Sequence, residues 1–236
     1  MRSLWIGPPL LLASASPTRR LLLEAVAVPV EQQSPEVDER EIEASCRGLA
    51  PDDLATHLAG EKARAISRRN PDRLVLGADQ VLSCDGRIFH KPQDRRAAES
   101  HLSALMGRTH VLHSAAVLSR AGEVVETIVD QAHLTMRHLS PDAIALYLDM
   151  VGEHAFTSVG AYQIEGYGLH LFESVTGNHA TILGLFFVGG LVGAVAFKAL
   201  GFSATIPIAA LLLAVASPPL LMDLRSASSA VEEAAQ

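Results

Sequence analysis

Hydroxyl and guanidinium side chains gather at one place near the start of the chain. Ser14 and Ser16 follow an apolar run, and Arg19 and Arg20 follow Pro17, a residue type that favours the first turn of a helix. Amides at a helix start with serine and arginine beside them form an anion site, because the helix dipole and the forked guanidinium both favour phosphate. A capped helix with solvent-facing arginines has the same pattern, so the segment indicates either a phosphate site or an ordinary helix start.

A carboxylate follows directly on the apolar run of residues 74–78. Asp79 thus stands at the expected end of a strand buried on both faces, where open α/β sheets place their ligand crevice. Such a carboxylate could hold a divalent metal or take a proton from water. It could equally end the strand by capping a turn, so the signal is weak by itself.

Two lysines and a glycine-rich segment are further candidates. Lys91 stands before a proline, and its compact ammonium suits a phosphate oxygen, although a solvated loop lysine has the same pattern. Lys62 lies in an expected helix, where such a charge usually faces solvent. Glu165 lies among glycines that would let a ligand approach closely. Gly166 and Gly168 do not make a dinucleotide fingerprint, which needs a third glycine and a following helix.

The pattern of apolar residues and turns predicts the elements that must carry these side chains. Helices are expected over residues 18–26, 51–66, 95–106 and 141–150. Strands are expected over residues 10–13, 28–33, 74–78, 110–118 and 124–136, and a polar loop over residues 37–40. Helices interleaved with strands, together with one hairpin, predict an α/β domain with a mixed central sheet and flanking helices.

Composition excludes several classes of protein. A net charge of −7 and an aromatic content of 5% give no indication of a nucleic-acid partner. Cys46 and Cys84 are too few for a disulfide framework and fit a reducing cytoplasm. His110 and His113 would point to opposite faces of their strand, so we do not expect them to share a metal.

The composition changes near residue 185. Between residues 182 and 222, Lys198 is the only charged residue. The runs 182–197 and 199–216 are nearly long enough for a pair of membrane helices. They could instead form an apolar helix pair at a dimer contact, or be foreign sequence joined by a gene fusion or a shift of reading frame. We therefore divide the chain into a domain, residues 1–185, and a tail, residues 186–236, and leave the three interpretations open.

Six motifs occur in order along the chain, at residues 11–20, 37–39, 61–63, 77–81, 91–92 and 161–166. Together they resemble the Maf family of nucleoside triphosphate pyrophosphatases over roughly residues 9–185. The resemblance implies an α/β fold with a deep cleft, related to inosine triphosphate pyrophosphatases. It implies a cytoplasmic, house-cleaning hydrolase that cleaves a nucleoside triphosphate into monophosphate and pyrophosphate. A divalent cation, Mg²⁺ or Mn²⁺, and a homodimer are also implied, with membrane contact if the tail is an anchor.

The resemblance assigns a role to each candidate. Asp79 is expected to be the general base that activates the attacking water, and to hold the metal together with Glu39. Contacts to the triphosphate are expected from Ser14, Arg19, Lys62 and Lys91.

Three positions bear on which base is bound. The branch of the family that acts on 7-methyl-GTP carries Trp, Gln and Glu there, and the dTTP/UTP branch carries Arg, Thr and Gln. This sequence has Thr18, Gln80 and Glu165. A carboxylate can accept hydrogen bonds from N1–H and the 2-amino group of guanine. The predicted substrate is therefore a modified nucleotide such as 7-methyl-GTP. The alternatives are a dTTP/UTP pyrophosphatase and a membrane-tethered nucleotide-binding protein linked to cell division.

Overall fold

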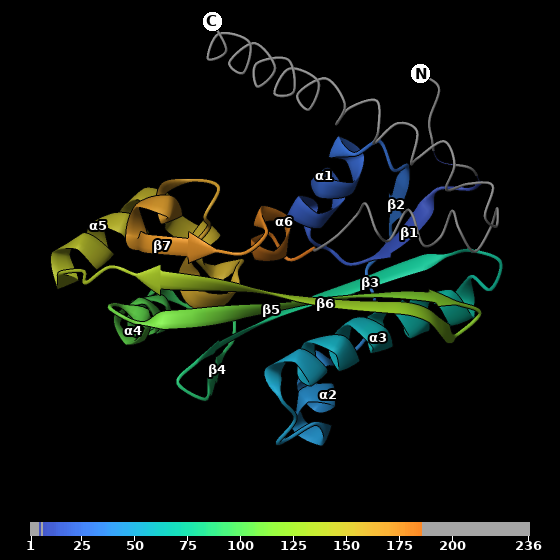
Figure 1. The fold of residues 1–236 in the computed structure, drawn as a ribbon, viewed down its shortest axis with the longest axis horizontal. Helices are drawn as coiled ribbons and strands as arrows, with labels where there is room; N and C mark the ends of the chain where they lie inside the picture. Colours follow the sequence, from blue (N-terminus) through green and yellow to red (C-terminus); the bar gives the residue numbers. More distant parts are fainter. Residues whose placement is uncertain (1–4, 6, 186–236) are drawn as a thin grey trace, which may run out of the picture. The chain divides into compact units, whose positions relative to one another are not determined.

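A mixed seven-stranded sheet organises the part of the chain that the computed structural model describes, Trp5 and residues 7–185 (Figure 1). The strand order is β2-β1-β3-β5-β6-β7, and β4 pairs with β3 away from this path. The strands are β1 (Leu10–Ala13), β2 (Val30–Gln32), β3 (Val75–Cys84), β4 (Arg87–Phe89), β5 (Thr109–Arg120), β6 (Glu123–Met136) and β7 (Phe172–Thr176). The predicted mixed sheet with flanking helices is confirmed.

The sheet has a parallel part and an antiparallel part. Strand β1 runs parallel to both β2 and β3, and the remaining pairs are antiparallel. Parallel neighbours need crossover connections, which are helical here. The helices are α1 (Pro17–Ala25), α2 (Glu39–Ser45), α3 (Pro51–Arg69), α4 (Arg95–Leu105), α5 (Pro141–Val151) and α6 (His179–Ile182), with short 3₁₀ turns over Gly152–Phe156, Val159–Ala161 and Tyr167–Leu171.

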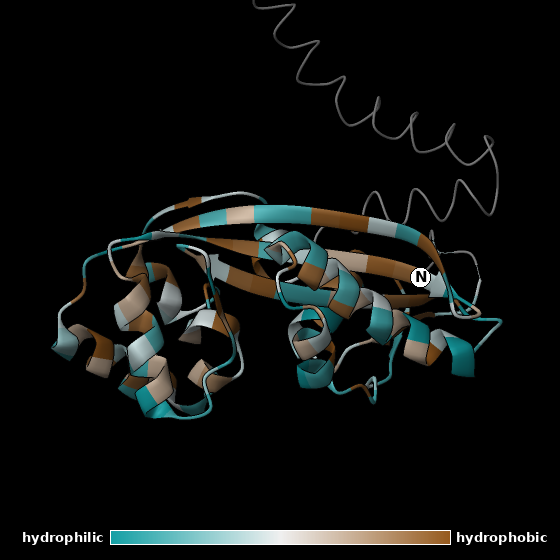
Figure 2. Cartoon of the chain, turned by 90° about the horizontal axis from the view of Figure 1, so that it is seen from below, coloured by the Kyte–Doolittle hydropathy of each residue, from teal (hydrophilic) through white to brown (hydrophobic). Residues whose placement is uncertain are grey.

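Two groups of helices cover the long strands. Helices α2 and α3 lie toward one end of the strands, and α4 and α5 toward the other (Figures 1 and 2). In Figure 2 the strands carry long apolar stretches while the helices alternate apolar and polar residues, as amphipathic helices packed on a sheet must. Val81 of β3 packs with Leu54 and Leu58 of α3, whereas its neighbour Leu82 packs with Leu102 of α4. The alternation of side chains along β3 therefore separates two apolar cores.

Helix α2 corrects the prediction of a polar loop over residues 37–40. The Asp38 carboxylate accepts hydrogen bonds from the backbone N–H groups of Arg40 and Glu41, at 3.0 and 3.1 Å. Glu39 and Glu41 place negative charge in the first helical turn, where the helix dipole favours it. The charged segment is thus a capped helix start, which matters because Glu39 is a candidate site residue.

Strand β3 is longer than the predicted strand. It runs from Val75 to Cys84, so Asp79 stands in mid-strand and not at the end. None of the helices among the described residues has the length and apolarity needed to cross a membrane. The predicted tail, residues 186–236, with its membrane or dimer role, lies outside the described residues, so the domain division stays a prediction.

Candidate active site

A gap in the pairing of β3 marks the place where the candidate residues meet. Along one edge, β3 pairs with β1 up to Gly77 and with β4 from Leu82 onward. Within the described chain, no strand pairs with residues 78–81 on this edge, while β5 pairs with them on the other. The free carbonyl of Ala78 accepts a hydrogen bond from Arg19 Nη1 at 2.8 Å. A side chain thus occupies the position of a missing strand.

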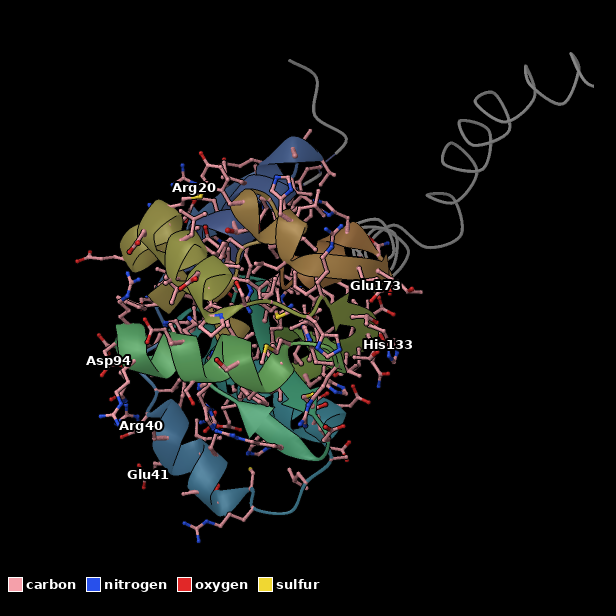
Figure 3. The ribbon with its side chains drawn as sticks, turned by 90° about the vertical axis from the view of Figure 1, so that its left-hand side faces the viewer. Arg20, Arg40, Glu41, Asp94, His133 and Glu173 are labelled. Carbon is pink, nitrogen blue, oxygen red and sulfur yellow. The ribbon has the colours of Figure 1, made fainter. Side chains whose placement is uncertain are left out.

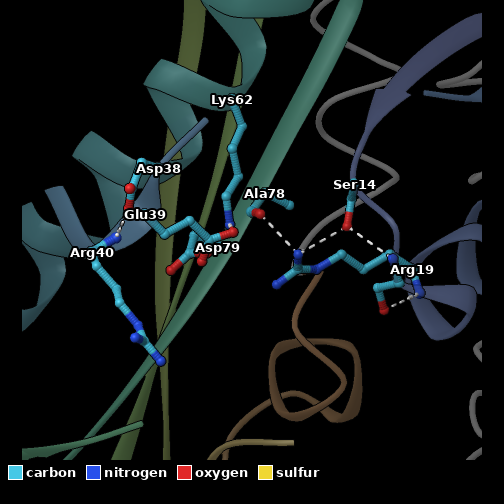
Figure 4. Close-up of polar contacts among 9 residues, drawn as sticks. Ser14, Arg19, Asp38, Glu39, Arg40, Lys62, Ala78 and Asp79 are labelled. Carbon is cyan, nitrogen blue, oxygen red and sulfur yellow. Dashed lines mark hydrogen bonds and ion pairs between the residues drawn. The ribbon is translucent and has the colours of Figure 1, made fainter. Parts of the chain in front are cut away.

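Arg19 reaches this gap from the start of α1. Its Nη1 also donates to Ser14 Oγ at 3.1 Å (Figure 4). Its Nε donates to the Gly184 carbonyl at 2.8 Å. Ser16 caps the helix by accepting from the Arg19 backbone N–H. Burial lowers the pKa of Arg19, and the charges of Asp79 and Glu39 oppose this shift. The guanidinium is therefore held in a fixed orientation beside the carboxylates.

The two arginines of the motif have different surroundings. Arg20 points outward with the other charged side chains labelled in Figure 3 and pairs with Glu24 at 2.9 Å. The structure therefore confirms the capped helix start, while the phosphate site stays a prediction that only Arg19 is placed to serve. Arg20 is the solvent-facing arginine of a capped helix, and Arg19 turns toward the gap.

A buried ion pair forms the other side of the site. Lys62 Nζ lies 2.6 Å from Asp79 Oδ1 and 2.8 Å from Glu39 Oε1 (Figure 4). The Lys62 side chain is 6% exposed and that of Asp79 11%, whereas Glu39 is 53% exposed. A lone helix lysine was expected to face solvent, but this one is turned inward, because α3 lies directly on β3.

Gly77 permits this close contact between α3 and β3. A Cβ atom at Gly77 would lie 2.1 Å from the Ala59 carbonyl oxygen and 2.8 Å from the Ala63 nitrogen. No real side chain tolerates such distances, so the helix backbone rests on the strand at this point. Lys62 precedes Ala63 on the helix and Asp79 follows Gly77 by two residues on the same strand face. The glycine therefore sets the distance at which the ion pair forms.

Lys91 completes the cationic side of the site. It follows β4 and precedes the buried Pro92. The residue keeps solvent contact, yet burial lowers its pKa, as do the nearby charges of Arg19 and Lys62, while Glu39 and Asp79 raise it. These influences place Lys91 in the same cluster. Three cations then face two carboxylates, an excess of positive charge that suits a polyanion such as a triphosphate.

The donor set suits a divalent cation only with ligands from outside the protein. Among the described residues, no group of three or more His, Cys, Asp or Glu side chains is arranged to hold a metal. Asp79 and Glu39 converge on one point, the Lys62 ammonium. Mg²⁺ is commonly bound by one or two carboxylates together with substrate phosphates and water. The two carboxylates fit that pattern and do not form a complete protein cage.

The three predicted specificity residues have different surroundings. Thr18 precedes Arg19 on α1 and is half-buried. Gln80 donates to the carbonyls of Thr181 and Ile182, on the sheet face opposite Asp79. Glu165 is exposed. Burial of the Tyr147 hydroxyl raises the pKa of that group, and the charge of Glu165 raises it further. Glu165 is not among the charges that shift the pKa of Arg19 or Lys91.

Sequence reasoning missed the polar residues that support the site. Ser114 of β5 donates to the Thr181 carbonyl at 2.7 Å, and Thr181 donates to Asp130 of β6. His113, on the other face of β5, contacts Asp52 at 2.7 Å and Ser83 at 2.9 Å. Polar residues facing inward from otherwise apolar strands were the available signal. The predicted deep cleft stays a prediction, since the cavity of about 210 Å³ beside Arg95 and Phe156 is lined by none of the candidates.

A mixed sheet with a cationic cluster at a gap in its edge defines an α/β protein with an anion site. Comparison with known proteins then gives the family. The model described as "Maf-like protein" matches residues 9–188, and this chain belongs to the Maf family. The resemblance stated from the motifs is confirmed.

Curated relatives support the same membership. A nucleoside triphosphate pyrophosphatase of Nitrobacter winogradskyi is 48% identical over 184 residues, covering 78% of this chain and 91% of the relative. A 7-methyl-GTP pyrophosphatase of Rhizobium etli is 50% identical over 180 residues, covering 75% of this chain and 90% of the relative. A solved dITP/XTP pyrophosphatase of Mycobacterium abscessus aligns with 61% of this chain and 96% of its own, at 20% identity and a TM-score of 0.35.

Proposed function

We propose that this protein is a nucleoside triphosphate pyrophosphatase, which hydrolyses the bond between the α and β phosphates and releases monophosphate and pyrophosphate. The observation that carries the proposal is the cluster of Arg19, Lys62 and Lys91 around Asp79. Relatives that carry the names nucleoside triphosphate pyrophosphatase and 7-methyl-GTP pyrophosphatase support it. An anion site with a carboxylate at its centre has the parts that phosphoryl transfer to water requires.

Each side chain has a separate task in this reaction. The triphosphate would lie at the gap in β3, where Arg19 and Lys91 offer cationic donors from two sides. Asp79 would take a proton from the attacking water as its oxygen bonds to phosphorus, and the pyrophosphate oxygen would leave with the bond electrons. Lys62, 2.6 Å from Asp79, orients the carboxylate. The fixed guanidinium would need little reorganisation as charge develops on the phosphates.

A divalent cation would be held by Asp79 and Glu39 together with phosphate oxygens. Bound there, Mg²⁺ or Mn²⁺ would neutralise negative charge on the triphosphate. Glu39 is more than half exposed and lies at the start of a short helix, so it can change partners with little loss of packing. The expected homodimer and cytoplasmic location stay predictions, as does membrane contact through the tail.

The favoured substrate is a guanine nucleotide such as 7-methyl-GTP. Glu165 can accept the two hydrogen bonds that guanine offers, whereas uracil and thymine offer one N–H between two carbonyls. The Rhizobium etli relative, half identical to this chain, is named for 7-methyl-GTP. Hydrolysis of dTTP or UTP is the second candidate, since Thr18 departs from the tryptophan of the 7-methyl-GTP branch.

Pyrophosphate release from 7-methyl-GTP, GTP, UTP, dTTP and CTP with Mg²⁺ or Mn²⁺ tests the proposal. We expect Asp79→Asn to lower kcat by about 100-fold or more, because a general base contributes on that scale, while nucleotide binding persists. Asp149→Asn removes an exposed carboxylate that pairs with Arg95 and is the charge-matched control, with unchanged turnover. Equal turnover in Asp79→Asn and wild type would show that the base is assigned wrongly. No release from any nucleotide would favour a binding role.

A further inference from the structure

Asp79 and Gln80 are neighbours on β3, but their side chains lie on opposite faces of the sheet. Side chains alternate along a strand, so Asp79 meets Lys62 of α3 while Gln80 points toward α6. Gln80 Nε2 donates to the Thr181 carbonyl at 2.8 Å and the Ile182 carbonyl at 3.1 Å. The last carbonyls of a helix lack partners within the helix. At the end of α6 the Gly184 N–H donates to the Thr181 carbonyl at 3.0 Å, and Gln80 supplies further hydrogen bonds.

Gln80 belongs to a polar row that crosses three strands. Gln80 lies opposite Ser114 of β5, and Ser114 lies opposite Asp130 of β6. Gln80 donates to Ser114 Oγ at 3.0 Å, Ser114 donates to the Thr181 carbonyl at 2.7 Å, and the Thr181 hydroxyl donates to Asp130. Gln80, Ser114 and Asp130 are thus each hydrogen-bonded to Thr181 of α6. Ser114 is 1% exposed and Thr181 is fully buried, so water does not compete for the bonds.

The chain leaving α6 leads to Arg19. Gly184 follows two residues after the helix with a φ of 81°, a conformation that glycine adopts without strain. Its carbonyl accepts from Arg19 Nε at 2.8 Å, while Ala78 O and Ser14 Oγ hold Nη1. The guanidinium is therefore fixed by β1, β3 and the segment after α6, and only the last of these depends on Gln80.

We propose that the polar row Gln80–Ser114–Asp130 is a positioning device, which clamps α6 so that the Gly184 carbonyl orients Arg19 toward the triphosphate. Gln80 then affects nucleotide binding through α6 and Arg19, whichever base the nucleotide carries. This deepens the proposed function, on which it rests. It adds a positioning role to Gln80, whose position the resemblance assigns to discrimination among bases.

Kinetics of three variants distinguish the two roles of Gln80. If it positions Arg19, Gln80→Ala, Ser114→Ala and Thr181→Val each raise KM about fivefold to 20-fold for every nucleotide. In Ser114→Ala and Thr181→Val the ratio of kcat/KM between 7-methyl-GTP and UTP then stays within twofold of wild type. Ser114 and Thr181 are buried and lie out of reach of a substrate. Gln131→Ala, which removes an amide bonded to Asp52 from the other face of the sheet, is the matched control and should leave KM unchanged.

A double-mutant cycle tests the route through Arg19. In an Arg19→Ala background, Gln80→Ala should add less than twofold, because its effect depends on the guanidinium. A tenfold change of the nucleotide ratio in Gln80→Ala alone, with Ser114→Ala behaving like wild type, would overturn the proposal in favour of base contact. So would full additivity of the two effects in the double variant.

Pyrophosphate binding separates this inference from the proposed function. If wild type cleaves no nucleotide, the proposed function fails, but calorimetric titration with pyrophosphate still reports the state of Arg19. Weaker binding in Gln80→Ala and Ser114→Ala, with normal binding in Gln131→Ala, would support the positioning role. Unchanged binding in both row variants would overturn it. Ser114→Ala removes only one hydroxyl, so pyrophosphate binding can still be measured in this variant if Gln80→Ala does not fold.

Discussion

Lys62 shows how packing gives a residue surroundings that helical spacing does not indicate. A lysine within a helix is usually solvated, and only the motif at residues 61–63 assigned this one to the candidate site. In the structure it is 6% exposed and bridges Asp79 and Glu39. Removing either Lys62 or Asp79 would be costly, because it would leave the other charge buried without a partner. The burial follows from packing of α3 on β3, which links residues far apart in the sequence.

The same limit applies to the other candidates. Ser14 and Arg19, which the motifs single out, are hydrogen-bonded to each other, and burial and the charge of Arg19 lower the pKa of Lys91, but their contact with a triphosphate stays a prediction. The motifs did not show that Arg20 faces away, which depends on how α1 packs. Nor did they show that Gln80 and Asp79 lie on opposite faces, which follows only because β3 continues past Asp79. The sequence predicts which residues are available, and the sheet decides which of them meet.

His110, which lies outside the candidate site, makes the stability of the fold depend on pH. Its Nε2 contacts the Tyr162 hydroxyl at 2.7 Å, and its buried Nδ1 has no hydrogen-bond partner in the described chain. Burial lowers the pKa of His110 from 6.5 to about 4. The unfolded chain therefore binds a proton more readily than the folded one between these pH values, so stability is lost as pH falls from 6.5 toward 4. The contribution is about 3 kcal/mol in full.

Urea unfolding at several pH values measures this contribution. The double variant His110→Phe/Tyr162→Phe removes the titrating ring without leaving the tyrosine hydroxyl unpaired. Between pH 7.5 and 5 its free energy of unfolding should fall less than that of wild type, by about 1–2 kcal/mol. Identical pH slopes would mean that the ring is protonated in the fold. Val129→Ala, a change at an exposed, non-titrating position on β6, is the control and should keep the wild-type slope.

At the scale of elements, the prediction of the fold succeeded where a segment carries its own signal. The amphipathic pattern of α4 and α5 and the apolar runs of β1 and β5 agree with the predicted ranges to within two residues. Helix α2 was missed because its signal is a capping Asp38 with few apolar residues, which also fits a loop. The end of β3 was misplaced because Asp79 interrupts the apolar run while the strand continues.

The contact of α3 with β3 is the element-level feature on which the site depends most. We expect Gly77→Ala to lower the free energy of unfolding by about 3 kcal/mol, since its Cβ would lie 2.1 Å from the Ala59 carbonyl oxygen. Moving the helix away would also separate Lys62 from Asp79, so kcat/KM should fall at least tenfold. Thermal and urea unfolding, followed by pyrophosphate-release assays on the folded fraction, measure both effects.

Gly60→Ala is the matched control for this prediction. Gly60 lies within α3, and a Cβ there would be 3.5 Å from Arg64 Nη1, an ordinary contact. Alanine in a helix interior is favoured over glycine by about 1 kcal/mol, so this variant should be more stable than wild type with normal activity. Equal behaviour of the two variants would show that α3 can move away from β3 without consequence.

At the scale of the whole molecule, the net charge of the chain is negative, whereas the charge of the candidate site is positive. The chain carries a net charge of −7, which repels a nucleotide at long range, while Arg19, Lys62 and Lys91 outnumber the two carboxylates locally. Physiological salt screens charges beyond about 8 Å, so the local excess governs binding. If the proposed site binds anions, we expect affinity to be lost when one cation of the cluster is removed and kept when a cation elsewhere is removed.

Stabilisation by pyrophosphate tests this in the intact chain without requiring turnover. A ligand that binds only the folded state at 100 times its Kd adds about 2.7 kcal/mol to the free energy of unfolding, which raises Tm by roughly 5–10 °C for a domain of this size. We expect that rise in wild type and less than half of it in Lys91→Ala, whose ammonium lies in the cluster. Arg95→Ala, which removes an exposed cation paired with Asp149 and Glu99, should keep the full rise. The same loss in both variants would mean that pyrophosphate responds to overall charge, and no rise in wild type would mean that the cluster does not bind it.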